Sequence, residues 1–158
     1  MPYIDKEDLE SNLERQIGWV RASESRLNLV LPLGTLLFGI IAAKLDQIPD
    51  DQKAVLFASW SSIVLISLSI TLAAISILPR TKGPTGSVLY FGSIAKIPLD
   101  KFKDEIDSSD QSSYRSDLIN QIHRNSQIAE IRYRLMKYSI LALLFSFPFW
   151  GYAASHLY

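Results

Sequence analysis

The chain has 158 residues, which is enough for one domain, and its 16 acidic and 16 basic residues give a net charge of zero. It contains no cysteine, which excludes disulfides and thiolate metal sites. The charges are segregated: nearly all lie outside three apolar stretches, residues 27–45, 54–78 and 138–157. Each stretch is long enough to cross a bilayer as a helix, so the sequence predicts a small integral membrane protein.

Basic residues near the ends of the stretches predict the orientation, because Lys and Arg flanking membrane helices tend to stay in the cytoplasm. Ten basic residues lie in segment 79–137, including Arg80 and Lys82 directly after the second stretch, whereas the short 46–53 connection is acidic. The charged first 26 residues argue against a cleavable signal peptide. We expect a cytoplasmic amphipathic helix (1–26), a membrane helix (27–45), an external loop (46–53), a membrane helix (54–78), a cytoplasmic sensor segment (79–137) and a membrane helix (138–157), with the N-terminus cytoplasmic and the C-terminus external.

The segment before the first stretch has the pattern of an amphipathic helix. Leu9, Leu13, Ile17 and Val20 follow the three-to-four residue spacing of one helical face. This helix is expected to continue straight into the membrane, with a local bend at Pro32.

The second stretch is rich in serine, and Ser62, Ser69 and Ser76 recur every seven residues. Small polar residues in such a stripe permit close helix packing and hydrogen bonds between helices, each worth roughly 1 kcal/mol. The stripe is therefore either a packing seam or a surface that meets water when an oligomer opens.

Segment 79–137 divides at its turns. Residues 87–95 form a short apolar piece compatible with a strand, a turn or contact with the membrane surface. A short helix is expected at 98–106, and a second helix should begin near Gln111, after possible N-cap residues, and run without a break into the third stretch. The predicted fold class is an all-α membrane protein with three transmembrane helices, two of which carry amphipathic cytoplasmic extensions that pack as a bundle.

Three short patterns stand out: Trp19, Arg21, Glu24 and Arg26 on the first helix, residues 90–95, and Gln121, Ser126, Ile128 and Arg132 on the later helix. Together they resemble the transmembrane-type Pycsar effector proteins, a family of bacterial antiphage membrane effectors. The first helix is similar to the Trp, Arg, acidic and Lys series of that family, and residues 90–95 are similar to its aromatic-Gly-x-Ile-Ala element. The later helix resembles its Gln…Ser-x-Ile…Lys series, and in both helices Arg replaces Lys.

The resemblance implies an effector of the bacterial inner membrane in antiviral defence. A companion cyclase makes cUMP or cCMP after infection, and the effector senses this nucleotide and impairs the membrane, which gives abortive infection. The resemblance thus implies an activating ligand but no cofactor, and the bilayer as a partner. We also expect a homo-oligomer, a companion cyclase that need not bind physically, and no nucleic-acid partner.

A cyclic nucleotide needs a cation for its phosphate, a flat or apolar surface for its base and an amide for the base edge. On the first helix Arg15, Trp19 and Arg26 fall within about 40° of one another, while Arg21 points elsewhere. A groove between this helix and the later one, which carries a polar strip, is the predicted ligand site. The strip consists of Gln121, Asn125 and Arg132.

Each of these residues also has an ordinary structural interpretation. Trp19 could instead be an aromatic residue of the membrane interface or of the bundle core. Arg26 and Arg132 could instead anchor the ends of the membrane helices that they flank. Arg21 is placed for a helix ion pair with Glu14 or Glu24, worth a few tenths of a kcal/mol.

The sequence shows no set of nucleophile, base and orienting acid, so an enzyme is not expected. Two separated histidines, His123 and His156, do not make a metal site. Two other functions remain open: a non-gated membrane structural or assembly protein, and a holin-like pore former without nucleotide sensing.

Overall fold

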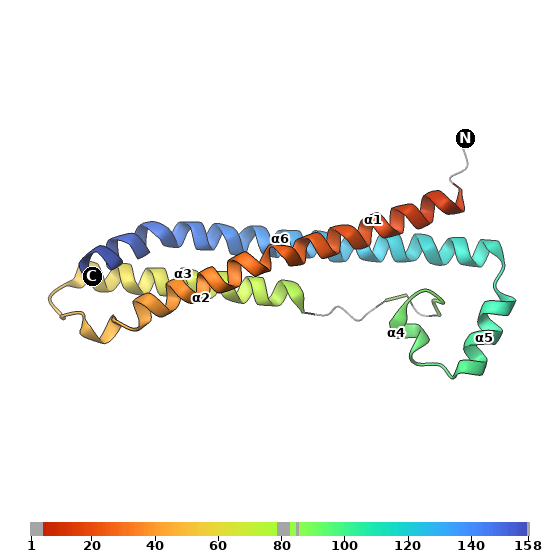
Figure 1. Ribbon diagram of the computed structural model, residues 1–158, viewed down its shortest axis with the longest axis horizontal. Helices are drawn as coiled ribbons and strands as arrows, with labels where there is room; N and C mark the ends of the chain where they lie inside the picture. The colour runs from red at the N-terminus through yellow and green to blue at the C-terminus, as the bar shows by residue number, and fades with distance from the viewer. Residues whose placement is uncertain (1–4, 79–82, 85, 158) are drawn as a thin grey trace. The chain divides into compact units, whose positions relative to one another are not determined.

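The computed structural model describes residues 5–78, 83–84 and 86–157, and within these ranges it contains helices and no strand. This confirms the predicted all-α fold class. The helices, shown in Figure 1, are α1 (Lys6–Ser25), α2 (Leu27–Ala42), a short 3-10 helix η1 (Leu45–Gln47), α3 (Lys53–Ile77), α4 (Phe91–Ile94), α5 (Leu99–Ser108) and α6 (Gln111–Leu157).

The chain divides into two compact units, which are described separately. The polar unit comprises Met1–Ala22 and Pro79–Ile131, and the apolar unit comprises Ser23–Leu78 and Arg132–Tyr158. Helix α6 is 47 residues long and contributes its first part to the polar unit and its second part to the apolar unit. The prediction that one helix runs from Gln111 through the third apolar stretch is therefore confirmed.

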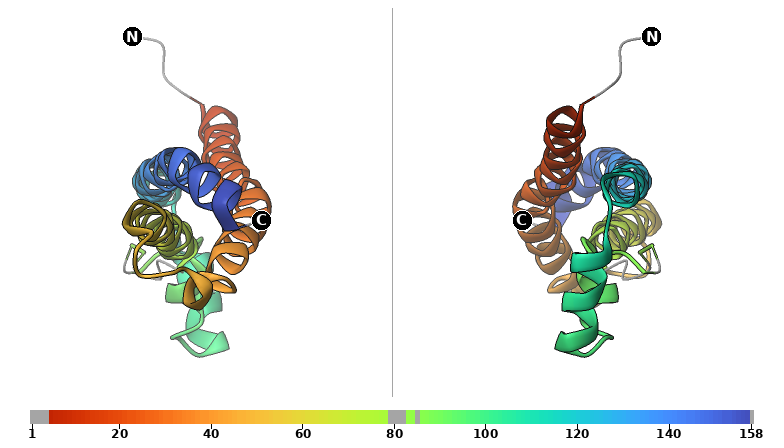
Figure 2. Two further views of the ribbon diagram at one scale, coloured as in Figure 1. Left: turned by 90° about the vertical axis from the view of Figure 1, so that its left-hand side faces the viewer. Right: turned by 90° about the vertical axis from the view of Figure 1, so that its right-hand side faces the viewer.

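The apolar unit consists of α2, α3 and the second part of α6, which surround a common core when viewed end-on (Figure 2). Leu27, Val30, Leu37, Ile66 and Met136 are among the buried residues of that core. Three helical segments are long and apolar enough to cross a membrane, namely Lys6–Gln47, Lys53–Ile77 and Gln111–Leu157.

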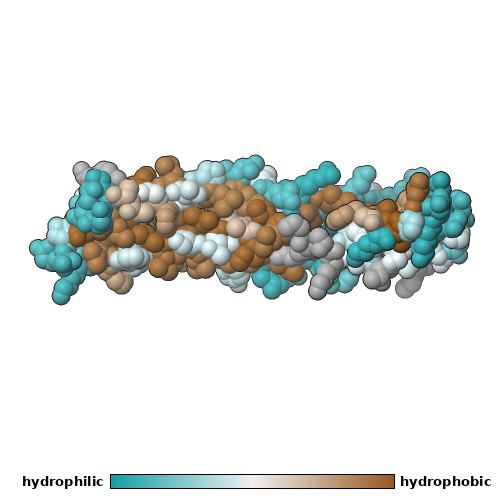
Figure 3. Space-filling model, turned by 90° about the horizontal axis from the view of Figure 1, so that it is seen from below, coloured by the Kyte–Doolittle hydropathy of each residue, from teal (hydrophilic) through white to brown (hydrophobic). Residues whose placement is uncertain are grey.

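The outer surface of the apolar unit is itself hydrophobic. On the face seen in Figure 3 most of this surface is brown, and large side chains such as Leu36, Phe57, Val64 and Phe145 are more than half exposed. Soluble monomers rarely expose contiguous apolar surface on this scale. A lipid environment accounts for it, because lipid tails are as apolar as these side chains.

The first long helix is divided at Arg26, which separates α1 from α2. The backbone of Arg26 is nevertheless helical, with φ −70° and ψ −24°. Its carbonyl oxygen accepts hydrogen bonds from the amides of both Leu29 and Val30, each at 3.2 Å. The expected passage from extension to membrane helix is thus present, with one irregular turn, and α2 continues through Pro32.

The serines of α3 are buried within the apolar unit. Ser62 and Ser69 are fully buried and Ser76 is 3% exposed. The Ser139 hydroxyl of α6 donates to the Ser69 carbonyl oxygen at 2.8 Å, and the two hydroxyl oxygens lie 3.1 Å apart. These contacts confirm the packing-seam interpretation for the single chain.

In the polar unit, α1 packs on the first part of α6, as expected for two amphipathic extensions. Leu9 and Leu118 are buried there. The Tyr114 hydroxyl donates to Glu10 Oε1 at 2.9 Å, and the Ser126 hydroxyl donates to Gln16 Oε1 at 3.1 Å. Two polar links thus join the helices.

The apolar piece at 87–95 forms an irregular segment followed by the four-residue helix α4. Phe91 is 67% exposed, whereas Val88 and Leu89 are partly buried. The short helix expected near residue 98 is α5, preceded by Pro98. Arg80 and Lys82, which contributed to the orientation prediction, lie outside the described residues.

Candidate ligand-binding site

Residues 87–90, the anchored segment, are held against α6 by one carboxylate. Asp117 Oδ2 accepts hydrogen bonds from the Ser87 hydroxyl at 2.9 Å, the Val88 amide at 3.0 Å and the Leu89 amide at 3.2 Å. The Ser87 oxygen accepts in turn from the Tyr90 amide at 2.9 Å. A carboxylate that accepts several backbone hydrogen bonds holds a segment in one conformation, since each bond is charge-assisted.

Gln121 provides a further hydrogen bond between α6 and the anchored segment. Its side chain is 6% exposed and its Nε2 donates to the Ser87 hydroxyl oxygen at 2.9 Å. One turn later, Asn125 Nδ2 donates to the Gln121 carbonyl oxygen at 2.9 Å. Both side-chain amides of the predicted polar strip are therefore placed within the polar unit by internal hydrogen bonds.

Asp117→Ala is expected to lower the free energy of unfolding by about 1–3 kcal/mol, because two backbone amides and a hydroxyl lose their shared acceptor. Thermal melting of the full chain in detergent measures this loss. Asp107→Ala, which removes an exposed carboxylate near the end of α5, serves as the matched control. Equal melting temperatures for the two variants would contradict the anchoring role of Asp117.

A cavity of about 400 Å³ lies beside this anchor, within the polar unit. Pockets that hold small molecules typically measure about 300–1,000 Å³. Val88, Leu89 and Leu118 contribute apolar walls, and Lys6 and Arg115 contribute cationic side chains. The cavity therefore combines apolar surface with two cationic side chains that could contact an anionic group, although two carboxylates, Asp5 and Asp110, also line it.

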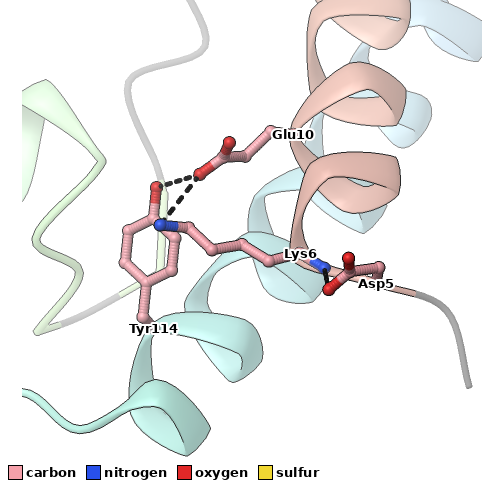
Figure 4. A network of polar contacts seen from close by, with 4 residues as sticks. All are labelled: Asp5, Lys6, Glu10 and Tyr114. Atoms are coloured by element: carbon pink, nitrogen blue, oxygen red, sulfur yellow. Dashed lines mark hydrogen bonds and ion pairs between the residues drawn. The ribbon is translucent and has the colours of Figure 1, made fainter.

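Tyr114 and Lys6 form part of the cavity wall and interact with each other (Figure 4). The Lys6 ammonium lies 4.8 Å from the centre of the Tyr114 ring and 3.6 Å from Glu10 Oε1. Burial and then the hydrogen bond to Glu10 raise the pKa of Tyr114 above its usual value of 10.0. At neutral pH the phenol is therefore protonated and donates to Glu10.

The cavity also borders the first turn of α6. Asp110 Oδ1 accepts a hydrogen bond from the Ser113 amide at 2.7 Å, which is the N-cap arrangement expected from the sequence. Hydrogen bonds from Ser113 hold the pKa of Asp110 below its usual value of 3.8. Above pH 3.8 the Asp110 carboxylate is therefore ionised and caps the helix. The cap weakens only as the pH falls through the lowered pKa and the carboxylate becomes protonated.

Three of the residues predicted from the sequence lie on the exposed surface of α1. These are Arg15, Trp19 and Arg21, and Trp19 is 53% exposed. The alternative that Trp19 belongs to the bundle core is therefore wrong for the single chain. None of the three contributes to the wall of the 400 Å³ cavity.

Arg26 and Arg132 lie in the other unit, close to the junction of α1 and α2. The Arg26 guanidinium is 5.0 Å from the centre of the Tyr133 ring. Arg132 is 8% exposed and its Nη1 is paired with Glu24 Oε1. Glu24 thus pairs with Arg132 across two helices, and not with Arg21 as one interpretation of the sequence suggested.

Sequence reasoning missed Lys6, Tyr114 and Arg115 as candidate ligand residues. One signal was available, because N-cap residues were expected just before Gln111 and helix N-termini favour anions. The remaining walls come from a distant segment, and no spacing along the chain indicates that contact. In the described part of the chain, no cluster of three or more His, Cys, Asp or Glu residues is suited to a metal ion.

Comparison with known proteins gives two matches and one negative result. A family model described as the Pycsar effector protein domain matches residues 8–157. The Pycsar effector protein PtPycTM of Propioniciclava tarda is 29% identical over 133 residues, which are 78% of this chain and 65% of the relative. The chain thus spans less than two thirds of that relative's length. No solved structure matches the chain.

Proposed function

This chain belongs to the Pycsar effector protein family, and from that membership we propose that it is an antiphage defence effector of the bacterial inner membrane. In this proposal the chain senses cUMP or cCMP and then impairs membrane integrity, which stops growth of the infected cell. The observation that carries the proposal is the family match over residues 8–157, which includes nearly all of both units.

The division of the chain into two units supports a separation of sensing and output. The polar unit holds the cavity with its cationic and apolar walls. The apolar unit has a hydrophobic exterior suited to lipid. We propose that the polar unit is the cytoplasmic sensor, with the N-terminus inside and the C-terminus outside, following the distribution of basic residues.

The output requires more than one copy of the chain or a direct effect on lipid. Three helices pack closely in the apolar unit around a buried core, so one chain does not enclose a pore. We propose a homo-oligomer whose arrangement changes when the nucleotide binds. A ligand shifts such an equilibrium only through its different affinity for the two arrangements. The role of the companion cyclase is to supply the nucleotide, and the proposal includes no catalytic reaction by this chain.

A binding panel tests the sensing step. The full chain, purified in detergent, is titrated with cUMP, cCMP, cAMP and cGMP while its melting temperature is followed. A ligand at about 100 times its Kd stabilises the folded state by about 2.7 kcal/mol, so cUMP or cCMP should raise the melting temperature measurably. The absence of a shift with all four nucleotides would refute nucleotide sensing.

A further inference from the structure

We propose that the cyclic nucleotide binds in the cavity at the start of α6, with its phosphate at Lys6 and Arg115 and its base against the apolar wall. The class of ligand rests on the proposed function, whereas the location rests on the cavity itself. The site differs from the groove predicted from the sequence, which requires Arg15 and Trp19.

The cavity is built from segments that are distant in the chain. Lys6 comes from the start of α1, Val88 and Leu89 from the anchored segment, and Arg115 and Leu118 from α6. Asp117 and Ser87 hold the backbone of the anchored segment, which places Val88 and Leu89 in the wall. The apolar wall is therefore positioned before any ligand arrives, which lowers the entropic cost of binding.

Lys6 is well placed to exchange its present partner for a phosphate. Its side chain is 57% exposed, and its contact with Glu10 is a surface ion pair at 3.6 Å. Such pairs contribute little to stability, so releasing Glu10 costs little. Glu10 keeps the hydrogen bond from the Tyr114 hydroxyl when Lys6 turns to a ligand (Figure 4).

The carboxylates in the wall oppose a second negative charge on the ligand. Lys6 and Arg115 face two carboxylates in the same wall, Asp5 and Asp110. Asp5 Oδ1 accepts from the Lys6 amide at 2.6 Å, and Asp110 accepts from the Ser113 amide. A cyclic phosphodiester carries one charge, whereas a linear monophosphate carries nearly two at neutral pH. The cavity should therefore prefer the cyclic nucleotide to its linear counterpart.

The test compares charge variants of the full chain in detergent by calorimetric titration with cUMP, cCMP and linear UMP. Lys6→Ala and Arg115→Ala should each weaken binding of the cyclic nucleotide about tenfold or more, because each removes a charge-assisted contact to phosphate. Lys6→Glu should weaken it further. The matched controls are Lys103→Ala on α5 and Arg124→Ala on α6, neither of which contributes to the cavity wall.

Failure of this site and failure of nucleotide sensing would give different results. The site is supported if the original chain and both controls bind the cyclic nucleotide equally and Lys6→Ala binds it about tenfold or more weakly. Binding that is unchanged in Lys6→Ala, Lys6→Glu and Arg115→Ala, but lost in Trp19→Ala, overturns the site and leaves nucleotide sensing intact. Linear UMP binding as tightly as cUMP would overturn the charge argument. No binding of any nucleotide by the original chain would overturn the proposed function and this inference together.

Discussion

Replacing Glu24 with alanine is expected to destabilise the chain more than replacing its partner Arg132 with methionine. The Arg132 side chain is only 10% exposed, whereas the Glu24 side chain is 50% exposed. Loss of Glu24 leaves a buried guanidinium without its counter-charge, and Arg132 Nε already has no hydrogen-bond partner among the described residues. An unpaired buried charge is strongly unfavourable, so Glu24→Ala should cost about 2–3 kcal/mol.

Arg132→Met leaves only a half-exposed carboxylate, which water solvates, and the methionine refills the buried volume. This variant should therefore cost about 1 kcal/mol or less. The double variant Glu24→Ala/Arg132→Met should be close in stability to Arg132→Met alone, because the buried charge is gone in both. Thermal melting in detergent of the three variants measures these differences. Equal losses for both single variants would show that the asymmetry of burial does not govern the pair.

Gly34→Leu is expected to disrupt the packing of α2 on α3. A Cβ at Gly34 would lie 3.1 Å from Ile70 Cγ1 and 3.5 Å from Ile70 Cδ1, and Gly34 itself is buried. A leucine has no room there without displacing the Ile70 side chain of the facing helix. Overpacking of this kind typically costs about 1–3 kcal/mol, which exceeds the helix propensity gained by removing a glycine.

Gly39→Leu is the matched control, because Gly39 lies in the same helix and has nothing within 4 Å of its added Cβ. It should be neutral or slightly stabilising, since leucine is the better helix former. Melting temperature in detergent is again the measurement. Equal melting temperatures for Gly34→Leu and Gly39→Leu would show that the packing of α2 on α3 does not depend on a close approach at Gly34.

The sequence was a good guide to the elements whose pattern is local. The apolar stretches, the long helix beginning at Gln111 and the presence of an N-cap within residues 108–110 follow from hydropathy, helical period and turn chemistry. The burial of Ser62, Ser69 and Ser76 follows from the seven-residue spacing, although Ser139 in α6, the partner of Ser69, could not be identified from α3 alone. Such contacts depend on which helix packs against which, and a single helix does not specify this.

The candidate site was much harder to predict. Gln121 has the right chemistry to read a base, yet its amide holds Ser87, which lies 34 residues earlier in the chain. Arg132 has the right charge to bind phosphate, yet it is paired with Glu24, 108 residues away. Residue type and helical face indicate what a side chain can do, but a tertiary partner decides which of these roles it takes. Lys6 and Arg115 share a cavity only after α1, α6 and the anchored segment come together.

Dye release from liposomes tests most directly whether a cyclic pyrimidine nucleotide makes this chain damage a bilayer, as proposed above. The full chain is reconstituted into vesicles with the polar unit facing outward, and cUMP, cCMP, cAMP or cGMP is added outside. We expect dye release with cUMP or cCMP and little release with the purine nucleotides or without ligand. Lys6→Ala should require about tenfold or more nucleotide for the same release. Vesicles that stay sealed with every nucleotide, or that leak equally without one, would contradict the account.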